Sequence, residues 1–107
     1  MSRNQVIVQF PLTGQWDLET LLEIEQALVG VFAQRHPFAV VDGHDIGQER
    51  FNIYIIPKGS WRPAIDRVHA LLTHRRALDA AKIVKQLKGS GKFVVVWPEQ
   101  FSGAFEI

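Results

Sequence analysis

The chain opens with a short run in which apolar and polar positions alternate. Over residues 5–12, Val6, Val8 and Phe10 fall on one face of an extended chain. Gln5, Ile7 and Gln9 fall on the other face. A period of two residues with many β-branched side chains is typical of a strand with one buried face. The pattern therefore predicts a first strand, which closes at Pro11.

The next segment has a helical period. From Leu18 to Phe32, apolar residues recur at spacings of three and four, which places them on one broad stripe of a helix. Asp17 precedes the stripe and is a favourable N-cap, because its carboxylate can accept hydrogen bonds from the first free amides. Proline disfavours helical geometry in the residue before it, so the helix must end ahead of His36-Pro37. We expect a helix over residues 17–34.

Two β-rich runs follow, residues 38–42 and residues 51–56. The connection between them, residues 43–49, is polar and contains two glycines. Short β-branched runs on either side of a Gly-containing connection are typical of an antiparallel hairpin. The pattern predicts that the two runs pair with each other through a rather long loop.

A second helix and a last strand complete the regular pattern. Ser60 can cap a helix in which Pro63 occupies the first turn, where a missing amide hydrogen costs nothing. Apolar residues at helical spacing continue from Ala64 to Leu72. Residues 93–97 are continuously apolar and precede Pro98, which predicts a strand that ends there.

Residues 77–88 fit two structures equally well. Ala80, Ile83, Val84 and Leu87 have the spacing of an amphipathic helix that Gly89 would terminate. The same residues, followed by a Gly-rich turn and a strong strand, also fit the first arm of a hairpin. Spacing alone leaves both alternatives open.

The predicted order is β-α-β-β-α-β, which is the split βαβ arrangement of ferredoxin-like folds. We therefore predict an α+β protein, a ferredoxin-like α/β plait in which two helices cover one face of an antiparallel sheet. With 107 residues, of which 47% are hydrophobic, we expect residues 1–107 to form one domain.

Composition narrows the chemistry further. The chain has no cysteine, which excludes disulfides, thiolate metal ligands and cysteine nucleophiles. It lacks an apolar stretch of the roughly 18 residues that a membrane span requires and an apolar secretory signal, so we expect a cytoplasmic protein without a membrane partner. Dinucleotide, P-loop and hydrolase-elbow motifs are absent, and we expect no cofactor.

Charge is distributed unevenly although the net charge is only +1. Residues 1–57 carry three basic and seven acidic side chains, and residues 58–92 carry nine basic and two acidic ones. The basic half could contact an anionic partner, but we favour an acidic first helix that lies beside a basic second helix and neutralises it.

The candidate site for chemistry is the connection between the second and third predicted strands. It brings Asp42, His44, Asp45 and Glu49 within eight residues. Carboxylates and an imidazole can bind a divalent cation or act in acid–base catalysis, provided that several converge. Asp and Gly are also the ordinary residues of turns, and we favour a structural turn without a metal.

The sheet face that the helices leave open is the candidate interface. It should present Asn52, Tyr54 and Ile56, and exposed semi-apolar surface of this kind is typical of protein interfaces. Trp97 is a further candidate anchor for this interface, although we favour packing against the core or its rim for this side chain. A homodimer through these faces, or a tail formed by residues 99–107, would cover the open face. The aromatic signature of RNA-recognition sheets is missing, so nucleic acid is not the expected partner.

Several motifs resemble those of small uncharacterised bacterial proteins of ferredoxin-like fold. They are the DGHDIG run at residues 42–47, the NIYI run at residues 52–55, and a late Trp97-Pro98. The resemblance covers residue 38 to the end and implies a strand over residues 82–87 that pairs with residues 93–97, hence a fifth strand. It implies no activity.

Three functions follow from these expectations. The first is a non-enzymatic domain that binds another protein or a second copy of itself, with an immunity-type inhibitor of a toxin as one concrete form. The first alternative is a small enzyme or metal-binding protein that uses the residue 42–49 connection. The second alternative is a non-specific nucleic-acid binder that uses the basic span of residues 62–92.

Overall fold

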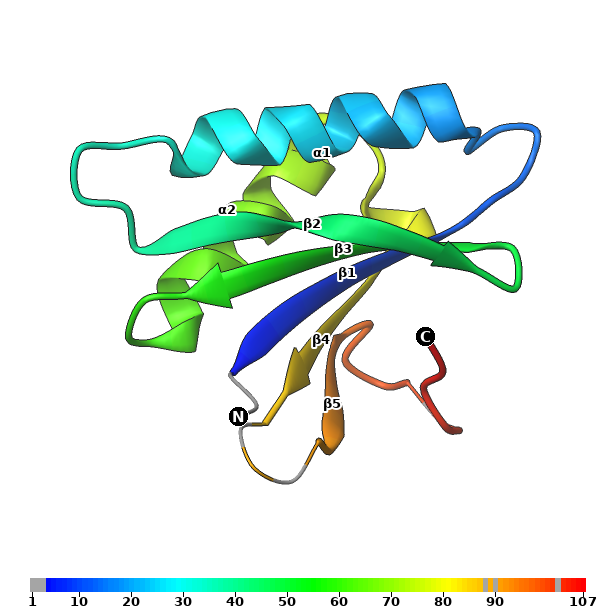
Figure 1. The fold of residues 1–107 in the computed structure, drawn as a ribbon. Coiled ribbons are helices and arrows are strands. Elements are labelled where there is room, and N and C mark those ends of the chain that lie inside the picture. Colours follow the sequence, from blue (N-terminus) through cyan, green and yellow to red (C-terminus); the bar gives the residue numbers. More distant parts are fainter. Residues whose placement is uncertain (1–3, 88, 90, 102) are drawn as a thin grey trace.

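The structure is a computed structural model that describes residues 4–87, 89, 91–101 and 103–107. Strands and helices are mixed along the chain (Figure 1). In chain order the elements are β1 (Gln5–Pro11), α1 (Leu18–Phe32), β2 (Ala39–Gly47), β3 (Arg50–Pro57), α2 (Trp61–His74), a short 3₁₀ helix (Leu78–Ala80), β4 (Lys82–Gln86) and β5 (Phe93–Trp97). None of the helices in the described part of the chain is long and apolar enough to span a membrane.

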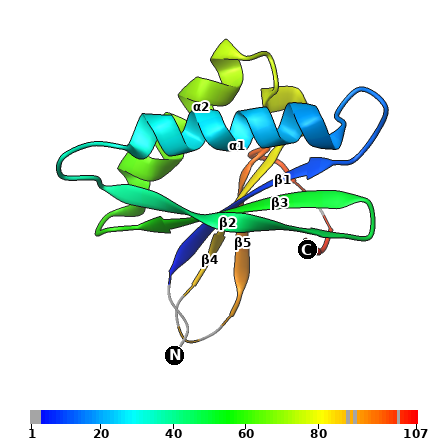
Figure 2. The same ribbon diagram turned by 45° about the horizontal axis from the view of Figure 1, so that its top comes forward.

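The strands form one five-stranded antiparallel sheet in the order β2-β3-β1-β4-β5. Both helices cover the same face of the sheet, as Figure 2 shows from above. The predicted α+β class, the pairing of β2 with β3 and the common side of the helices are therefore confirmed. The arrangement is compatible with an α/β plait. We call the uncovered side the outer face.

Local capping explains where the helices begin. The Asp17 carboxylate accepts a hydrogen bond from the amide of Thr20 at 2.9 Å, and the Ser60 hydroxyl accepts one from the amide of Arg62 at 3.3 Å. Each cap satisfies a helix amide that has no partner within its own helix. Both predicted caps are confirmed, and α1 ends two residues earlier than expected, at Phe32.

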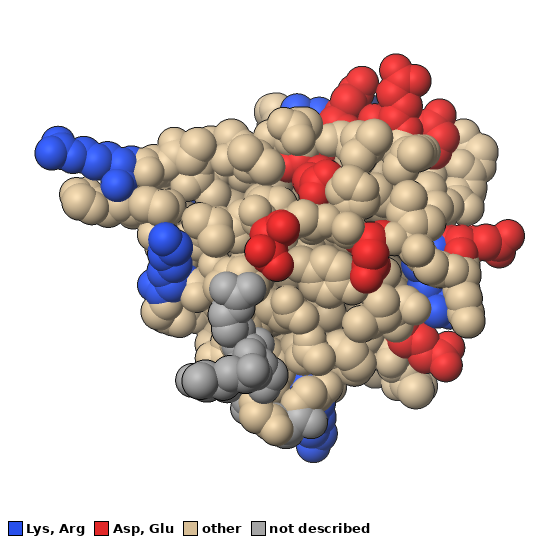
Figure 3. All heavy atoms as spheres, viewed as in Figure 1, with Lys and Arg blue, Asp and Glu red and all other residues tan. Residues whose placement is uncertain are grey.

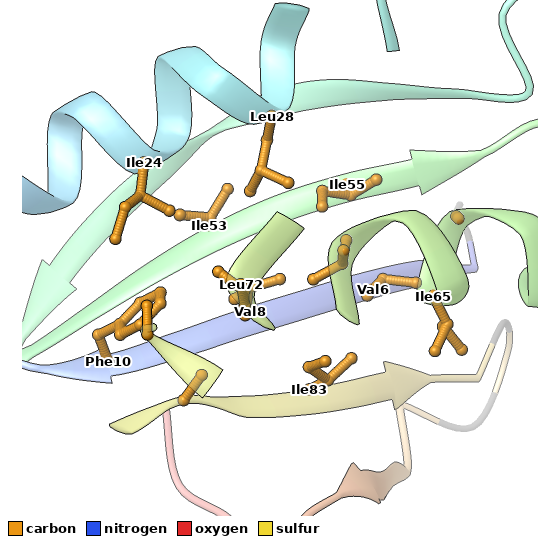
Figure 4. Packing of buried hydrophobic residues seen from close by; sticks show 14 of the residues in the cluster. Val6, Val8, Phe10, Ile24, Leu28, Ile53, Ile55, Ile65, Leu72 and Ile83 are labelled. Carbon is orange, nitrogen blue, oxygen red and sulfur yellow. The ribbon is translucent and has the colours of Figure 1, made fainter. Parts of the chain in front are cut away.

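The core lies between the two helices and the sheet. Val6, Val8 and Phe10 of β1 are fully buried there, as expected, but Ile7 and Gln9 are buried on the opposite face, so β1 does not have the single buried face that its alternation predicted. Figure 4 shows Val6, Val8 and Phe10 pointing toward side chains that come from both helices, β3 and β4. The cluster includes Ile24, Leu28, Ile53, Ile55, Ile65, Leu72 and Ile83.

The prediction of a long loop between β2 and β3 is wrong. β2 continues to Gly47, and only Gln48 and Glu49 form the turn, with φ of 49° and 63°. One register shift near Gly43 leaves Asp42 as the extra residue of a β-bulge, where Gly43 adopts φ of 139°. The first glycine thus serves a bulge within an edge strand, a role that Gly fills easily because it has no Cβ.

The ambiguous residues 77–88 resolve as the hairpin alternative. One 3₁₀ turn ends at Ala80, and β4 then pairs with β1 on one side and with β5 on the other. Ile83 and Val84 are both fully buried, on opposite faces of the sheet, which a helix with one apolar face could not achieve. Lys88 and Ser90 of the predicted turn lie outside the described residues.

Candidate functional site

A row of polar side chains crosses the outer face of the three strands β1, β3 and β2. Gln9 lies opposite Asn52, and Asn52 lies opposite Asp45, so the three share one level of the sheet. Tyr54 stands one step along β3 on the same face. Gln9 and Asn52 are buried, and Asp45 is exposed at the sheet edge. We call these four residues the polar row.

Hydrogen bonds connect the polar row from end to end. The Tyr54 hydroxyl donates to Oδ2 of Asp45 at 2.8 Å, and Nδ2 of Asn52 donates to Oδ1 of the same carboxylate at 3.0 Å. Nε2 of Gln9 donates to Oδ1 of Asn52 at 2.9 Å. The Asp45 carboxylate is thus the terminal acceptor of the row.

The carboxylate decides which way both amides point. An ionised Asp45 can only accept, so Asn52 must turn its NH₂ group toward Asp45 and its oxygen toward Gln9. Gln9 must then use Nε2 for Asn52, which leaves the second N–H of that nitrogen directed away from the row. The row therefore holds a buried donor in a fixed orientation.

Tyr54 keeps its proton in this setting. Burial, the hydrogen bond to Asp45 and the negative charge of Asp45 all raise the pKa of Tyr54 well above its usual value. The hydroxyl consequently remains a donor throughout the physiological pH range. It anchors the carboxylate end of the row.

The second N–H of Gln9 meets a backbone carbonyl from the end of the chain. Gln9 Nε2 donates to the carbonyl of Glu106 at 2.7 Å. Beside it, the Arg50 guanidinium lies 3.6 Å from Oε2 of Glu106 and donates to the carbonyl of Ile107 at 3.4 Å. Residues 98–101 and 103–107, which we call the tail segment, thus return to the sheet after β5 (Figure 1).

Two aromatic contacts complete the hold on the tail segment. The ring of Phe105 packs edge-on against Phe93 of β5 with centroids 5.1 Å apart. The Lys82 ammonium lies 5.4 Å above the ring of Phe101. The prediction that residues 99–107 could fold over the outer face therefore agrees with these contacts.

A cleft of about 290 Å³ lies beside this contact area. It is formed where β1, β3 and β4 meet the 3₁₀ helix, and its lining residues are Gln9, Pro11, Arg50, Asp79, Ala80, Ala81, Lys82 and Pro98. Two cations and one anion line it, together with the side chain of Gln9. The site can thus offer an amide donor and two positive charges to a bound chain.

The four residues of the predicted 42–49 site do not converge. Successive side chains of a strand point to opposite faces, so His44 turns toward α1 while Asp45 joins the polar row. His44 Nδ1 hydrogen-bonds Oε1 of Glu25 at 2.8 Å. Asp42 occupies the bulge and Glu49 the turn. Over the ranges that the structure describes, no group of three His, Asp or Glu residues could hold a metal ion.

The predicted interface residues divide between the two faces. Asn52, Tyr54 and Ile56 alternate with core residues of β3 and belong to the outer face. Trp97 lies on the helix side, where its Nε1 donates to the carbonyl of Leu78 at 3.1 Å and its ring packs against His69. These four residues therefore do not form one surface.

The basic span is likewise spread over several surfaces. Lys82 faces the tail segment, Lys85 lies 5.6 Å from the Trp61 ring and Arg67 lies 5.7 Å from the Phe38 ring. Arg75 lines a groove between the helices together with acidic residues of α1. Figure 3 shows those acidic side chains gathered over the first turns of α1. The charge pattern fits neighbouring helices of opposite sign better than one continuous basic patch.

Sequence reasoning missed Gln9, Arg50 and the tail contacts as parts of one site. The available signal was a glutamine in the middle of an otherwise apolar strand, since a buried polar side chain requires a partner. Its partner, the carbonyl of Glu106, is 97 positions away in the chain.

Comparison of the chain with protein-family models, with curated proteins and with solved structures found no match in any of the three.

Proposed function

We propose that this chain is a non-enzymatic protein-interaction domain whose outer sheet face binds an extended peptide that carries an aromatic and an acidic residue. The observation that carries the proposal is the hydrogen bond from the oriented Gln9 amide to the carbonyl of Glu106. The tail segment occupies the site within its own chain and indicates the chemistry of the ligand.

Three kinds of contact define that chemistry. Gln9 offers a donor for a peptide carbonyl, Arg50 offers a cation for an acidic side chain, and Phe93 offers a ring for an aromatic one. The donor is preorganised because Asp45 and Asn52 hold it whether or not a peptide is bound. Preorganisation of this kind lowers the entropic cost of binding.

The tail segment is held weakly enough to be exchanged. Its one backbone-to-backbone bond in the described part of the chain is local, from the amide of Phe101 to the carbonyl of Pro98 at 3.3 Å. The Glu106 side chain is 71% exposed, and ion pairs of such exposure contribute about 0–1 kcal/mol. Segments with few buried contacts open at low free-energy cost.

We also propose the ferredoxin-like plait as the fold of this domain. Two features support the proposal: the order β2-β3-β1-β4, and the presence of one helix in each of the two crossovers that link parallel strands. β5 would then be an addition to the β4 edge of the plait.

The test uses a fluorescently labelled peptide with the sequence of residues 99–107 and the full-length chain. In the wild type, the tail segment competes at an effective concentration on the order of 1 mM, so the peptide should bind weakly. The double substitution Phe105→Ala, Glu106→Ala weakens that competitor. Fluorescence anisotropy should then show the peptide binding at least about tenfold more tightly, which corresponds to about 1.4 kcal/mol.

Two controls make the result specific. Adding Arg50→Gln to the double variant should weaken peptide binding again, because the acidic residue loses its cation. On the Arg50→Gln background, a peptide with glutamine at the position of Glu106 should bind as tightly as the wild-type peptide, because the cation that distinguishes the two peptides is absent. Equal binding of a scrambled peptide, or no binding to any variant, would overturn the proposal.

A further inference from the structure

β5 is an edge strand that consists only of apolar residues. It runs Phe93-Val94-Val95-Val96-Trp97, and it pairs with β4 on one side while no strand of the sheet lies on the other. Among the described residues, the tail segment forms no backbone hydrogen bond with it. An apolar edge of this kind is a ready template for another strand.

The two edges of the sheet differ in charge, although each contains a register shift, beside Gly43 in β2 and at Val96 in β5. β2 contains a bulge at Asp42 and presents exposed acidic side chains at Asp42 and Asp45. Charged side chains on an edge strand discourage pairing with another edge, and β5 has none. The contrast within a single sheet singles out β5 as the edge that accepts a partner.

The register identifies which backbone groups of β5 are available. The amide of Leu87 donates to the carbonyl of Lys92, so these two form a hydrogen-bonded pair. Antiparallel ladders alternate, and Val94 therefore directs its N–H and C=O toward β4. Phe93 and Val95 direct theirs toward the open edge.

A groove with both apolar and charged lining residues runs alongside β5 on the helix side, between this strand and α2. Two adjoining hollows of about 230 and 250 Å³ share Arg62, Ile65 and Val96 as lining residues. Their remaining lining residues are Ser60, Trp61, Asp66, His69, Ile83, Lys85, Trp97 and Glu99. Val94 of β5 is 38% exposed.

The charges along this groove change sign from one end to the other. Arg62 lines both hollows and lies 3.8 Å from Asp66, so the charges that differ between the two ends are Lys85 in the hollow at the start of α2 and Glu99 in the other hollow. A two-fold axis through Val95 would reverse the direction of a second β5, and the basic end of one copy would meet the acidic end of the other. The groove is thus complementary in charge to itself.

From this edge and this charge pattern we infer that β5 pairs with β5 of a second copy of the chain, antiparallel about Val95. Each Val95 amide then donates to the carbonyl of its counterpart, and the two sheets join into one continuous sheet. A C₂ contact of this type is closed and gives a dimer, not a fibre. Because the strand is short, we expect a dissociation constant in the range of about 1–100 μM.

The experiment is sedimentation velocity on the full chain from about 1 to about 500 μM, a range that brackets the expected constant. The wild type should change from a species of 12.1 kDa to one of twice that mass as concentration rises. Val95→Pro removes an outward N–H without removing a bond to β4, and it should remain a single copy. Circular dichroism checks that each variant is folded.

A matched pair of lysine substitutions tests the edge independently. Val94 and Val29 are exposed to 38% and 40%, but Val29 lies on α1, away from β5. Val94→Lys should raise the dissociation constant at least about tenfold, and Val29→Lys should leave it unchanged. Equal effects of the two, or a wild type that stays single at every concentration, would overturn the inference.

Dimerisation by exchange of tail segments is a separate outcome that the same series detects. The Phe105→Ala, Glu106→Ala variant should dimerise like the wild type if β5 forms the contact. Loss of the dimer in that variant alone would overturn the β5 contact and assign the association to the tail site.

Discussion

His44 of β2 and Glu25 of α1 are joined by a hydrogen bond of 2.8 Å between Nδ1 of the His44 imidazole and Oε1 of the Glu25 carboxylate. The Glu25 side chain is only 8% exposed, and the imidazole is stacked on Phe51 with ring centroids 4.8 Å apart. The contact ties the edge strand to the helix that covers it. It gives His44 a structural partner in the helix layer.

Removing the imidazole leaves a buried carboxylate without that partner. His44→Ala should therefore lower the free energy of unfolding by about 1–3 kcal/mol, the cost typical of an unsatisfied buried polar group. Urea unfolding followed by circular dichroism measures the change. His36→Ala is the control, because His36 is exposed, and it should alter stability by less than about 0.5 kcal/mol. Equal stability of the two variants would contradict the role assigned to His44.

The centre of the polar row should be sensitive to an apolar replacement. Asn52→Leu removes both an acceptor for Gln9 and a donor to Asp45 in a fully buried position. We expect a loss of about 1–3 kcal/mol in the free energy of unfolding. Gln26→Leu on the exposed side of α1 serves as the control in the same denaturation experiment. A neutral Asn52→Leu would show that the row contributes nothing to stability.

Tyr54 provides a direct optical readout of the row, because it is the only tyrosine of the chain. A free tyrosine is half ionised near pH 10, and burial together with Asp45 raises the pKa of Tyr54 above that value. Phenolate absorbance near 295 nm should therefore be almost absent at pH 10 in the folded protein.

Asp45→Asn should move this titration to lower pH without restoring the free value, since burial remains. The sign for stability follows from the same shift. Between the unfolded and the folded pKa, the folded state retains a proton that the unfolded state releases, so stability should fall as pH rises above about 10. A wild-type titration midpoint at the free value would contradict the hydrogen bond to Asp45.

The β2–β3 turn contains strain that a substitution can relieve. Gln48 and Glu49 both have positive φ, as a two-residue hairpin turn requires, although neither is glycine or asparagine. Gln48→Asn with Glu49→Gly should raise the free energy of unfolding by about 1 kcal/mol. Thermal unfolding measures the change in stability. A lower melting temperature would contradict the turn geometry.

Sequence patterns predicted the elements in which core-facing apolar residues recur at a regular spacing. The alternation through Val8 and the helical stripe through Leu28 both reach the core as expected. The second half of β2 was misread as a loop because an edge strand exposes polar side chains, such as Asp45, and such residues are also typical of turns. Its extent is set by pairing with β3, which no local pattern records.

The candidate site was less accessible to prediction for a similar reason. Asn52 and Tyr54 could be assigned to the outer face from alternation alone. Their connection to Gln9 and then to Glu106 depends on strand order and on a chain reversal after β5. Trp97 packs against the core, as favoured from the sequence, and does not join the outer-face residues, because the register shift between Ile83 and Val84 turns it toward the helices.

The burial of β1 on both faces has a consequence for how the molecule opens. Ile7 and Val84 are fully buried on the outer face, just as Val6 and Val8 are on the helix side. Release of the tail segment would expose the polar site to solvent, while β1 would keep its backbone pairing with β3 and β4. Peptide exchange and global denaturation are thus separate events, and binding can proceed on an intact scaffold.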